Sequence, residues 1–214
     1  MSATTLIIAR HGNTFGLGDT PIRVGAHTDL DLVESGLEQG RMIGQYLNEN
    51  DRVPDVLFSG ALKRSRHTAE RTCEEMGIDN ERIIVEELFN EIDYGPDENK
   101  TEDIVIARIR QEAIDLWNDK AVVPDGWKVD PESLIGKWQN FAERCEKDFP
   151  GQVILVVTSN GIARFAPYLT GDFEAFTKEH KINISTGALC FFNKIKGEDS
   201  WTCDSWNLRP KDYI

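Results

Sequence analysis

The stretch QVILVVTSNGIARF, residues 152–165, indicates how this chain folds. Its first part, 153–158, is a run of β-branched residues and leucine, which is typical of a strand buried on both faces of a sheet. The run stops at a Ser-Asn-Gly turn, and apolar residues then recur at helical spacing: Ile162, Phe165 and Leu169. A buried strand that leads directly into a helix predicts the rim of an α/β sheet, where ligands usually bind.

Strand and helix patterns alternate on both sides of this stretch. Five more short runs predict strands, the last two of them paired as a closing hairpin: 4–9, 55–59, 82–88, 188–193 and 200–206. We therefore expect an α/β fold with a largely parallel sheet covered by helices on both faces and an antiparallel pair at one edge. We also expect a single domain, residues 1–214, in which a helical insertion at about 96–150 caps the rim of the sheet.

The composition limits the partners of the chain. A formal net charge of −13 over 214 residues argues against binding to nucleic acid or to an anionic membrane surface. No apolar run approaches the roughly 20 residues of a membrane span, and the first residues lack a signal-peptide pattern, so we expect a cytoplasmic protein. The four cysteines form no C-x-x-C motif and have no histidine at ligand spacing, which argues against a zinc site.

The first candidate for chemistry is LIIARHGNT, residues 6–14, where a strand runs directly into Arg10-His11-Gly12. A histidine at this position acts as a nucleophile if one ring nitrogen keeps its lone pair while the proton on the other is held, often by a backbone carbonyl. The neighbouring Arg10 offers a planar fork of donors that suits phosphate oxygens. This motif alone is weak, because an exposed histidine at a strand end is a common feature.

Two further stretches bring complementary groups to the same rim. FSGALKRSRHTAE, residues 58–70, ends a strand and opens a helix, which places Arg64 in a first turn that already favours anions. LFNEIDYG, residues 88–95, places Glu91 just past another predicted strand. Together the rim segments supply a candidate nucleophile, two arginines and a carboxylic acid.

These motifs, in this order, resemble those of the histidine phosphatase superfamily in its phosphoglycerate-mutase-like branch, across nearly the whole chain. The resemblance rests on Arg10-His11-Gly12 with Asn13-Thr14, on residues 28–40 and 62–70, and on NEIDYG at 90–95. It implies a three-layer α/β/α sandwich, in agreement with the pattern described above.

The resemblance also implies a role for each residue. His11 is expected to be the nucleophile that takes a phosphoryl group, and Arg10 and Arg64 are expected to clamp its oxygens. Glu91 is expected to give a proton to the leaving oxygen and later to draw one from water, and Asn13 to add a phosphate contact. Phosphoryl transfer asks mainly for in-line positioning and dispersed positive charge, which this set of residues supplies.

The chain departs from the family pattern at the stretch quoted first. Family members usually carry a second histidine after this strand, and here Ser159 falls at its place, followed by Asn160. We expect the Ser159 hydroxyl, the Asn160 amide and the backbone N–H groups that follow to bind the phosphate as neutral donors. Such donors lack the charge of an imidazolium, so a slowed or specialised enzyme is expected.

Substrate-selecting residues are harder to predict. Arg23, in the loop 16–28, is a candidate for a further anion contact, and Trp127 is a more natural pocket residue than Trp138, which fits a core stripe. Neither a metal nor another cofactor is expected, and the predicted partner is a small phosphorylated substrate. The sequence leaves the identity of that substrate and the oligomeric state open.

Four interpretations stay open from the sequence, and the stretches around Arg64 and Glu91 argue against the last, an unrelated small-molecule-binding α/β protein with a chance Arg-His-Gly. The first is a phosphomonoester hydrolase acting through phosphohistidine. The second is a phosphoglycerate-type mutase, ranked lower because such mutases usually keep the second histidine and have a longer, mobile tail than LRPKDYI, residues 208–214. The third is a phosphate-binding or interaction protein with impaired catalysis.

Overall fold

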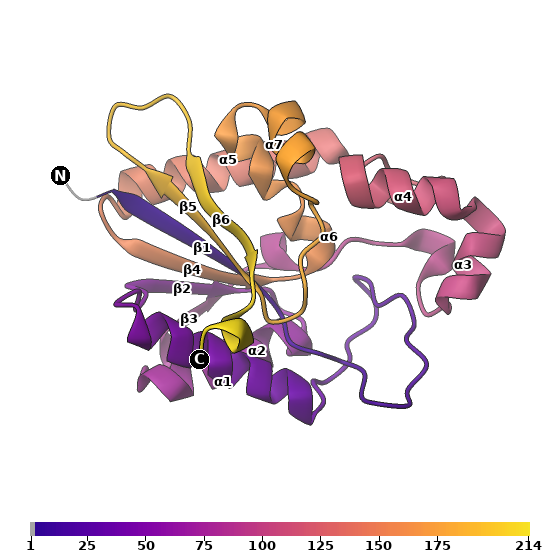
Figure 1. The fold of residues 1–214 in the computed structure, drawn as a ribbon, viewed down its shortest axis with the longest axis horizontal. Coiled ribbons are helices and arrows are strands. Elements are labelled where there is room, and N and C mark those ends of the chain that lie inside the picture. The colour runs from indigo at the N-terminus through magenta and orange to yellow at the C-terminus, as the bar shows by residue number, and fades with distance from the viewer. Residues whose placement is uncertain (1–2) are drawn as a thin grey trace.

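A computed structural model describes residues 3–214. Its centre is a six-stranded sheet in the order β3-β2-β4-β1-β5-β6. The strands are β1 (Thr4–Arg10), β2 (Val56–Ser59), β3 (Ile83–Val85), β4 (Val153–Thr158), β5 (Leu189–Lys194) and β6 (Thr202–Leu208). The first four run parallel to one another, while β5 and β6 form an antiparallel hairpin at the β1 edge. The predicted mixed sheet is confirmed, and Figure 1 shows it between two layers of helices.

The predicted strand at 82–88 is wrong in length. Only Ile83–Val85 pairs with β2, and the chain then turns through a short 3-10 helix at Glu87–Phe89. Ile84 and Val85 are exposed at this outer edge of the sheet, so there is no buried face to extend the strand. The early end of β3 directs the following segment back toward β2 and β4, where it carries Glu91 to the rim.

The two faces of the sheet bury different side chains of the same strands. In β1, Leu6 and Ile8 face one core cluster while Ile7 and Ala9 face the other, as the alternation of a strand requires. The second cluster is closed by α1 (Glu34–Glu49) and α2 (Lys63–Met76), which pack closely against each other. The close packing of these two helices depends on Gly40 and Gly44, where any Cβ would meet α2.

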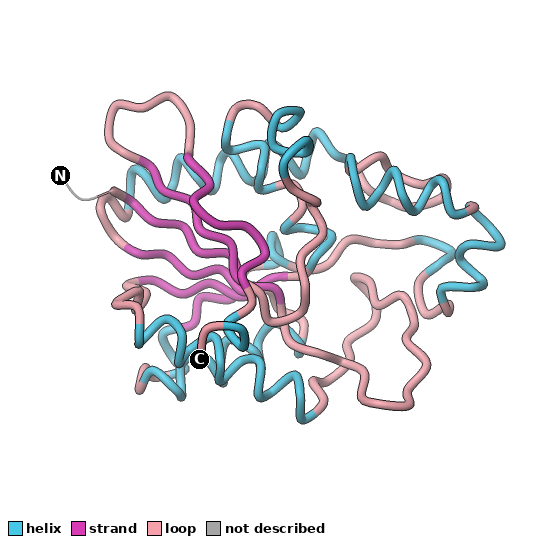
Figure 2. Tube along the Cα trace, viewed as in Figure 1, coloured by secondary structure: helices cyan, strands magenta, loops and turns pink. Residues whose placement is uncertain are grey.

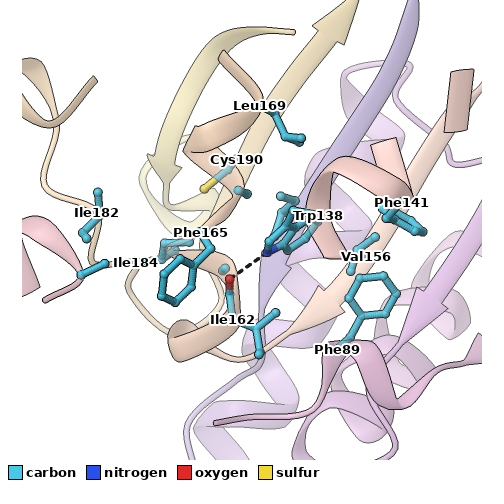
Figure 3. Close-up of a cluster of buried hydrophobic side chains, with 14 of the residues drawn as sticks. Phe89, Trp138, Phe141, Val156, Ile162, Phe165, Leu169, Ile182, Ile184 and Cys190 are labelled. Atoms are coloured by element: carbon cyan, nitrogen blue, oxygen red, sulfur yellow. Dashed lines mark hydrogen bonds between the residues drawn. The ribbon is translucent and has the colours of Figure 1, made fainter. Parts of the chain in front are cut away.

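The first cluster is covered by α5 (Pro131–Asp148), α6 (Asn160–Ala163) and α7 (Phe173–Glu179). Trp138 of α5 donates its Nε1–H to the carbonyl oxygen of Ile162, 2.9 Å away, and Phe141 packs against Phe89 (Figure 3). The Asp130 side chain caps α5 by accepting from Ser133 N. Because α5 packs on the face of the sheet, this part of the segment 96–150 is not a cap.

Beyond the carboxyl ends of the parallel strands lie α3 (Glu102–Ile109), α4 (Gln111–Lys120) and the long loop after β1, as the tube in Figure 2 shows. Arg110 separates the two helices with a φ of 70°, a conformation that breaks the helical path. The loop and α3 are joined by a bridge between Ile22 and Thr101. Within residues 3–214, no helix has the length and apolar character needed to cross a membrane.

Candidate active site

A cavity of about 560 Å³ opens at the carboxyl ends of β1 and β4. Six residues predicted from the sequence line this cavity: Arg10, His11, Asn13, Arg23, Glu91 and Asn160. Its outer wall comes from the loop after β1 and from α3 and α4. Arg64 and Ser159, also predicted, do not line it. The remaining histidines, His27, His67 and His180, lie outside the lining as well.

His11 is buried, and its ring is oriented by its own main chain. Nδ1 lies 2.8 Å from the carbonyl oxygen of Gly12, an acceptor that requires the proton to sit on Nδ1. Nε2 therefore carries the lone pair in the neutral ring. Burial, with the charges of Arg10 and Arg64 beside it, holds the pKa of His11 well below its ordinary value. The structure therefore holds His11 as a neutral imidazole with an available lone pair on Nε2.

The position of His11 is fixed by close backbone packing. Its N–H donates to Thr158 of β4 at 2.9 Å, and the Gly12 N–H donates to the Thr68 hydroxyl at 2.9 Å. A Cβ on Gly12 would overlap the backbone of Gly36 at the start of α1. Glycine is therefore needed at position 12 for the close contact between the turn after β1 and the start of α1.

Arg10 lies at the end of β1, and Arg64 approaches His11 from the first turn of α2. Arg10 donates Nη1–H to the carbonyl oxygen of Ile184, and its Nε is buried with no partner in the described chain. Arg64 donates to the carbonyl oxygens of Thr28 and Gly25, and its Nε is likewise buried and unpartnered. Burial lowers the pKa of each guanidinium and a nearby Glu91 opposes this shift. Both arginines therefore keep N–H groups free, although Arg64 lies behind the cavity surface.

Glu91 is held by backbone donors. Its Oε1 accepts from the N–H of Ile92 at 2.9 Å, and its Oε2 accepts from the N–H of Gly161 at 3.3 Å. A Cβ at position 161 would overlap Glu91 Oε1, so glycine is needed where the carboxyl group meets the start of α6. The structure corrects one expectation here, because the Gly161 N–H is directed to Glu91 and not to a ligand. Glu91 forms no ion pair with a described residue.

Ser159 and Asn160 behave differently from the expectation. Ser159 is fully buried, its hydroxyl has no partner among residues 3–214, and it does not reach the cavity surface. Asn160 does line the cavity, but its amide binds protein: Oδ1 accepts from Ile184 N at 2.9 Å and Nδ2 donates to Asn183 Oδ1 at 2.5 Å. Ser159 is the extended residue between β4 and α6, whereas Asn160 is the first residue of α6, and only Asn160 faces the cavity.

Asn13 is also tied to protein. Its Oδ1 accepts from the Thr186 hydroxyl, its Nδ2 donates to the Ser35 hydroxyl at 3.2 Å, and its backbone N–H donates to Gln39. These contacts hold the side chain at the place where it lines the cavity. Asn13 thus links the loop after β1 to the segment before β5.

Arg23 lies between aromatic rings and a carboxylate. Its guanidinium is 5.3 Å from the ring centroid of Tyr94 and 5.0 Å from that of Trp127, and it pairs with Glu102 of α3. Trp127 was expected to line the pocket, but it is buried behind Arg23 and donates its indole N–H to Asp97 at 2.7 Å. The tryptophan in the cavity wall is Trp117.

Arg164 lines the cavity and was not predicted as a site residue from the sequence. It is 1% exposed, stacks 3.9 Å from the centroid of Trp117, and donates Nη1–H to the Trp117 carbonyl at 2.6 Å. Burial lowers its pKa to about 10, opposed by Tyr94 and Glu91. It has no carboxylate ion-pair partner among the described residues. The sequence did contain a signal for Arg164 as a site residue, because a basic residue shortly after a buried strand lies near the rim of the sheet.

Tyr94 is the second missed residue. It lines the cavity beside Arg23, and burial raises the pKa of its hydroxyl, with the charge of Glu91 adding to the shift. No described residue hydrogen-bonds that hydroxyl. The NEIDYG stretch contained the signal, because the same turn that delivers Glu91 also delivers Tyr94.

One group of side chains in the described part of the chain has the spacing of a metal site. Ligand atoms of His27, Asp93 and Glu98 lie within 4.8 Å of one another. These atoms already have partners, since His27 Nε2 meets Asp93 at 3.2 Å, Lys128 Nζ meets Asp93 at 3.4 Å, and Thr28 donates to Glu98. None of the three lines the cavity.

The chain and its fold are similar to those of known proteins. The model of the histidine phosphatase superfamily (branch 1) matches residues 6–209. A 2,3-bisphosphoglycerate-dependent phosphoglycerate mutase from Parvibaculum lavamentivorans is 26% identical over 75% of this chain and 77% of its own. A mycobacterial glucosyl-3-phosphoglycerate phosphatase superposes with a TM-score of 0.76 at 20% identity, covering 96% of this chain and 99% of that one. A phosphoserine phosphatase mutant from Entamoeba histolytica, in complex with phosphoserine, gives 0.74 at 18% identity, covering 98% and 99%.

Proposed function

Because the chain belongs to the histidine phosphatase superfamily (branch 1), we propose that it is a phosphomonoester hydrolase that works through a phosphohistidine at His11. The observation that carries this proposal is the bond between His11 Nδ1 and the Gly12 carbonyl oxygen, which leaves Nε2 as the free nucleophilic atom. The depressed pKa of His11 keeps that atom unprotonated at neutral pH.

In the first step, Nε2 attacks phosphorus while the bond from phosphorus to the ester oxygen breaks. The proton of Glu91 passes to the leaving oxygen. Arg10 disperses the charge of the three peripheral oxygens through its free N–H groups, and Arg64, which lies behind the cavity surface, adds its positive charge. In the second step, water attacks the phosphohistidine, its proton returns to Glu91, and the phosphorus–nitrogen bond breaks. Inorganic phosphate leaves and the enzyme is regenerated.

The departure at Ser159 predicts a lower rate than that of an enzyme with an imidazolium at this position. Loss of one transition-state donor typically costs on the order of 10²–10³ in rate. Ser159 is buried below the cavity surface and Asn160 is bound to the 183–184 segment, so neither replaces that donor directly. We expect turnover to rest on Arg10, Arg64 and Glu91.

The environment of Arg164 favours a substrate that carries a second anionic group. A buried cation without a carboxylate partner is costly, and an anion from the ligand relieves that cost. Arg164 and Arg23 both line the cavity, but Glu102 neutralises only Arg23. Phosphoglycerates and phosphoserine, named in the similar proteins, carry a carboxylate beside the phosphoryl group. We therefore propose a small phosphorylated metabolite with a carboxylate or second phosphate on its leaving portion.

A mutase is the second candidate, favoured by the similarity to a phosphoglycerate mutase. In that reaction the phosphoryl group returns from His11 to the substrate, so water is excluded from the phosphoenzyme. The two functions share the first step and differ only in the acceptor of the second.

The experiment that separates them is turnover in ¹⁸O-labelled water with phosphoserine and 3-phosphoglycerate. Hydrolysis places one labelled oxygen in each released phosphate. A mutase gives isomerised ester, needs priming by a bisphosphorylated compound, and releases little phosphate. A protein that binds both esters but shows no chemistry with either contradicts the proposal. Because no step uses a metal ion, chelators are expected to leave the rate unchanged.

A further inference from the structure

The segment 182–187, between α7 and β5, forms one side of the candidate active site. Ile182 and Ile184 bury their side chains in the same core cluster as Phe165 (Figure 3). At its far end, the Gly187 N–H donates to the carbonyl oxygens of Arg10 and His11 at 3.1 and 3.2 Å. The segment is thus attached both to the core and to the strand end that carries the nucleophile.

Asn160 holds this segment by both ends of its amide group. Its Oδ1 accepts the Ile184 N–H at 2.9 Å, and its Nδ2 donates to Asn183 Oδ1 at 2.5 Å. Two hydrogen bonds from one planar amide fix direction as well as distance. Ile184 is 1% exposed, so its N–H would lose its partner with little access to water if Asn160 were shortened.

The other side of Ile184 faces Arg10. The Ile184 carbonyl oxygen accepts the Nη1–H of Arg10 and is the sole acceptor that residues 3–214 provide for that guanidinium. The Nε of Arg10 stays buried without a partner, next to the cavity that the side chain lines. The orientation of the free N–H groups of Arg10 is therefore set by one carbonyl, whose own residue is held by Asn160.

We propose that Asn160 is a positioning residue that orients Arg10 through Ile184, and not a phosphate ligand itself. The inference rests on the proposed function only in taking Arg10 as a group that binds the phosphoryl oxygens. A planar guanidinium binds an oxyanion well in a narrow range of orientations, and a displacement of about 1 Å at a reacting centre typically costs on the order of 100-fold. Asn160 thus stabilises the orientation in which Arg10 offers its fork to the cavity.

The test is a double-mutant cycle read by the affinity for orthovanadate, which needs no turnover. Asn160→Ala is expected to weaken vanadate binding about tenfold, the effect of losing a hydrogen bond to a buried group. Arg10→Lys removes the fork that Asn160 orients, so Asn160→Ala is expected to change affinity less than twofold in that background. Equal effects in both backgrounds would show that Asn160 acts on the anion independently of Arg10, and would overturn the inference.

Asn207→Gly is the matched control. It removes the bond from Ser185 N to Asn207 Oδ1 in the same segment, and glycine tolerates the φ of 58° at position 207. Vanadate affinity is expected to stay unchanged. A loss equal to that of Asn160→Ala would mean that any loosening of the segment has this effect, and would also overturn the inference.

A milder variant covers the case in which Asn160→Ala does not fold. Asn183 is exposed, and Asn183→Ala breaks only one of the two amide bonds, so vanadate affinity is expected to fall about threefold. Unchanged affinity in that variant would contradict the inference. If Arg10→Lys alone left vanadate binding intact, the proposed phosphoryl site itself would fail, which is a separate result.

Discussion

The Nδ1 atom of His11 lies 2.8 Å from the carbonyl oxygen of Gly12, so the residue that follows His11 fixes the tautomer of its ring. Gly12 is held in turn by Thr68, whose hydroxyl accepts from the Gly12 N–H and donates to the carbonyl oxygen of Arg64. One short chain of hydrogen bonds therefore connects the proposed nucleophile, His11, with the helix that carries a candidate phosphate-binding arginine.

The neutral state of the His11 ring predicts an unusual pH dependence for the rate of phosphoryl transfer. A free imidazole loses its lone pair near pH 6.5, but here burial and two arginines lower the pKa well below that value. The neutral nucleophile therefore persists as the pH falls through about 6.5, and the single-turnover rate of phosphoryl transfer is expected to decline only at lower pH. A midpoint at or above about 6.5, assigned to His11 by NMR of its ring, would contradict this expectation.

The lowered pKa of His11 also affects the free energy of unfolding. Below about pH 6.5 the unfolded chain binds a proton at His11 that the folded chain does not, so the free energy of unfolding falls as the pH decreases through that range. His11→Asn removes this contribution. Urea unfolding of both proteins at about pH 5.5 and 7.5 is expected to show a smaller pH difference for the variant.

Gly161→Ala is expected to displace Glu91. The added methyl group would overlap the Glu91 carboxyl group, so we expect kcat to fall at least about tenfold, because a general acid–base contributes about 10²–10⁴. Gly136→Ala in α5 is the control, since nothing lies within 4 Å of the added carbon. That control is expected to retain activity and to gain about 0.5–1 kcal/mol in stability. Full activity of Gly161→Ala would exclude the proposed placement of Glu91.

The variant Arg164→Gln tests whether Arg164 binds a second anionic group on the substrate. The variant is expected to lose about 10- to 100-fold in kcat/KM for phosphoserine, the effect of one hydrogen bond to a charged group, and little for an uncharged aryl phosphate leaving group. Steady-state kinetics on both substrates measure the ratio. An equal loss of kcat/KM for both substrates would mean that Arg164 only stabilises the shape of the cavity. The argument for an anionic leaving portion would then fail.

Asp97→Asn tests the support of the cavity wall. Asp97 is 1% exposed and accepts from Arg108 Nε at 2.6 Å and from the indole of Trp127 at 2.7 Å. Burial alone would raise the pKa of Asp97, but these bonds bring it below its ordinary value. Its contribution to stability is therefore present above about pH 4 and lost as the pH falls below that. We expect the variant to lose about 1–3 kcal/mol at pH 7 by denaturant unfolding, and an unchanged midpoint would contradict this.

The sequence predicted well what depends on strand order. His11, Glu91 and Asn160 meet in one cavity because the carboxyl ends of parallel strands share one edge, and short apolar runs were enough to place those ends. The short β3 was harder to predict, since its apolar residues are exposed and only pairing with β2 defines its length.

Contacts across long separations could not be predicted. The burial of Arg164 depends on Trp117 of α4, 47 residues away, and the role of Asn160 depends on residues 183 and 184. Nothing local to either residue contains that information. Ser159 and Asn160 are adjacent in the chain, yet only Asn160 reaches the cavity, and the sequence did not distinguish the two.

The central claim is that His11 carries the phosphoryl group, and the most direct measurement is rapid quench with a ³²P-labelled phosphoester followed by peptide mapping. We predict an acid-labile, base-stable label on the peptide that contains His11, formed within one turnover and absent from His11→Asn. Released phosphate with no label on His11, or an equal label in the variant, would contradict the account.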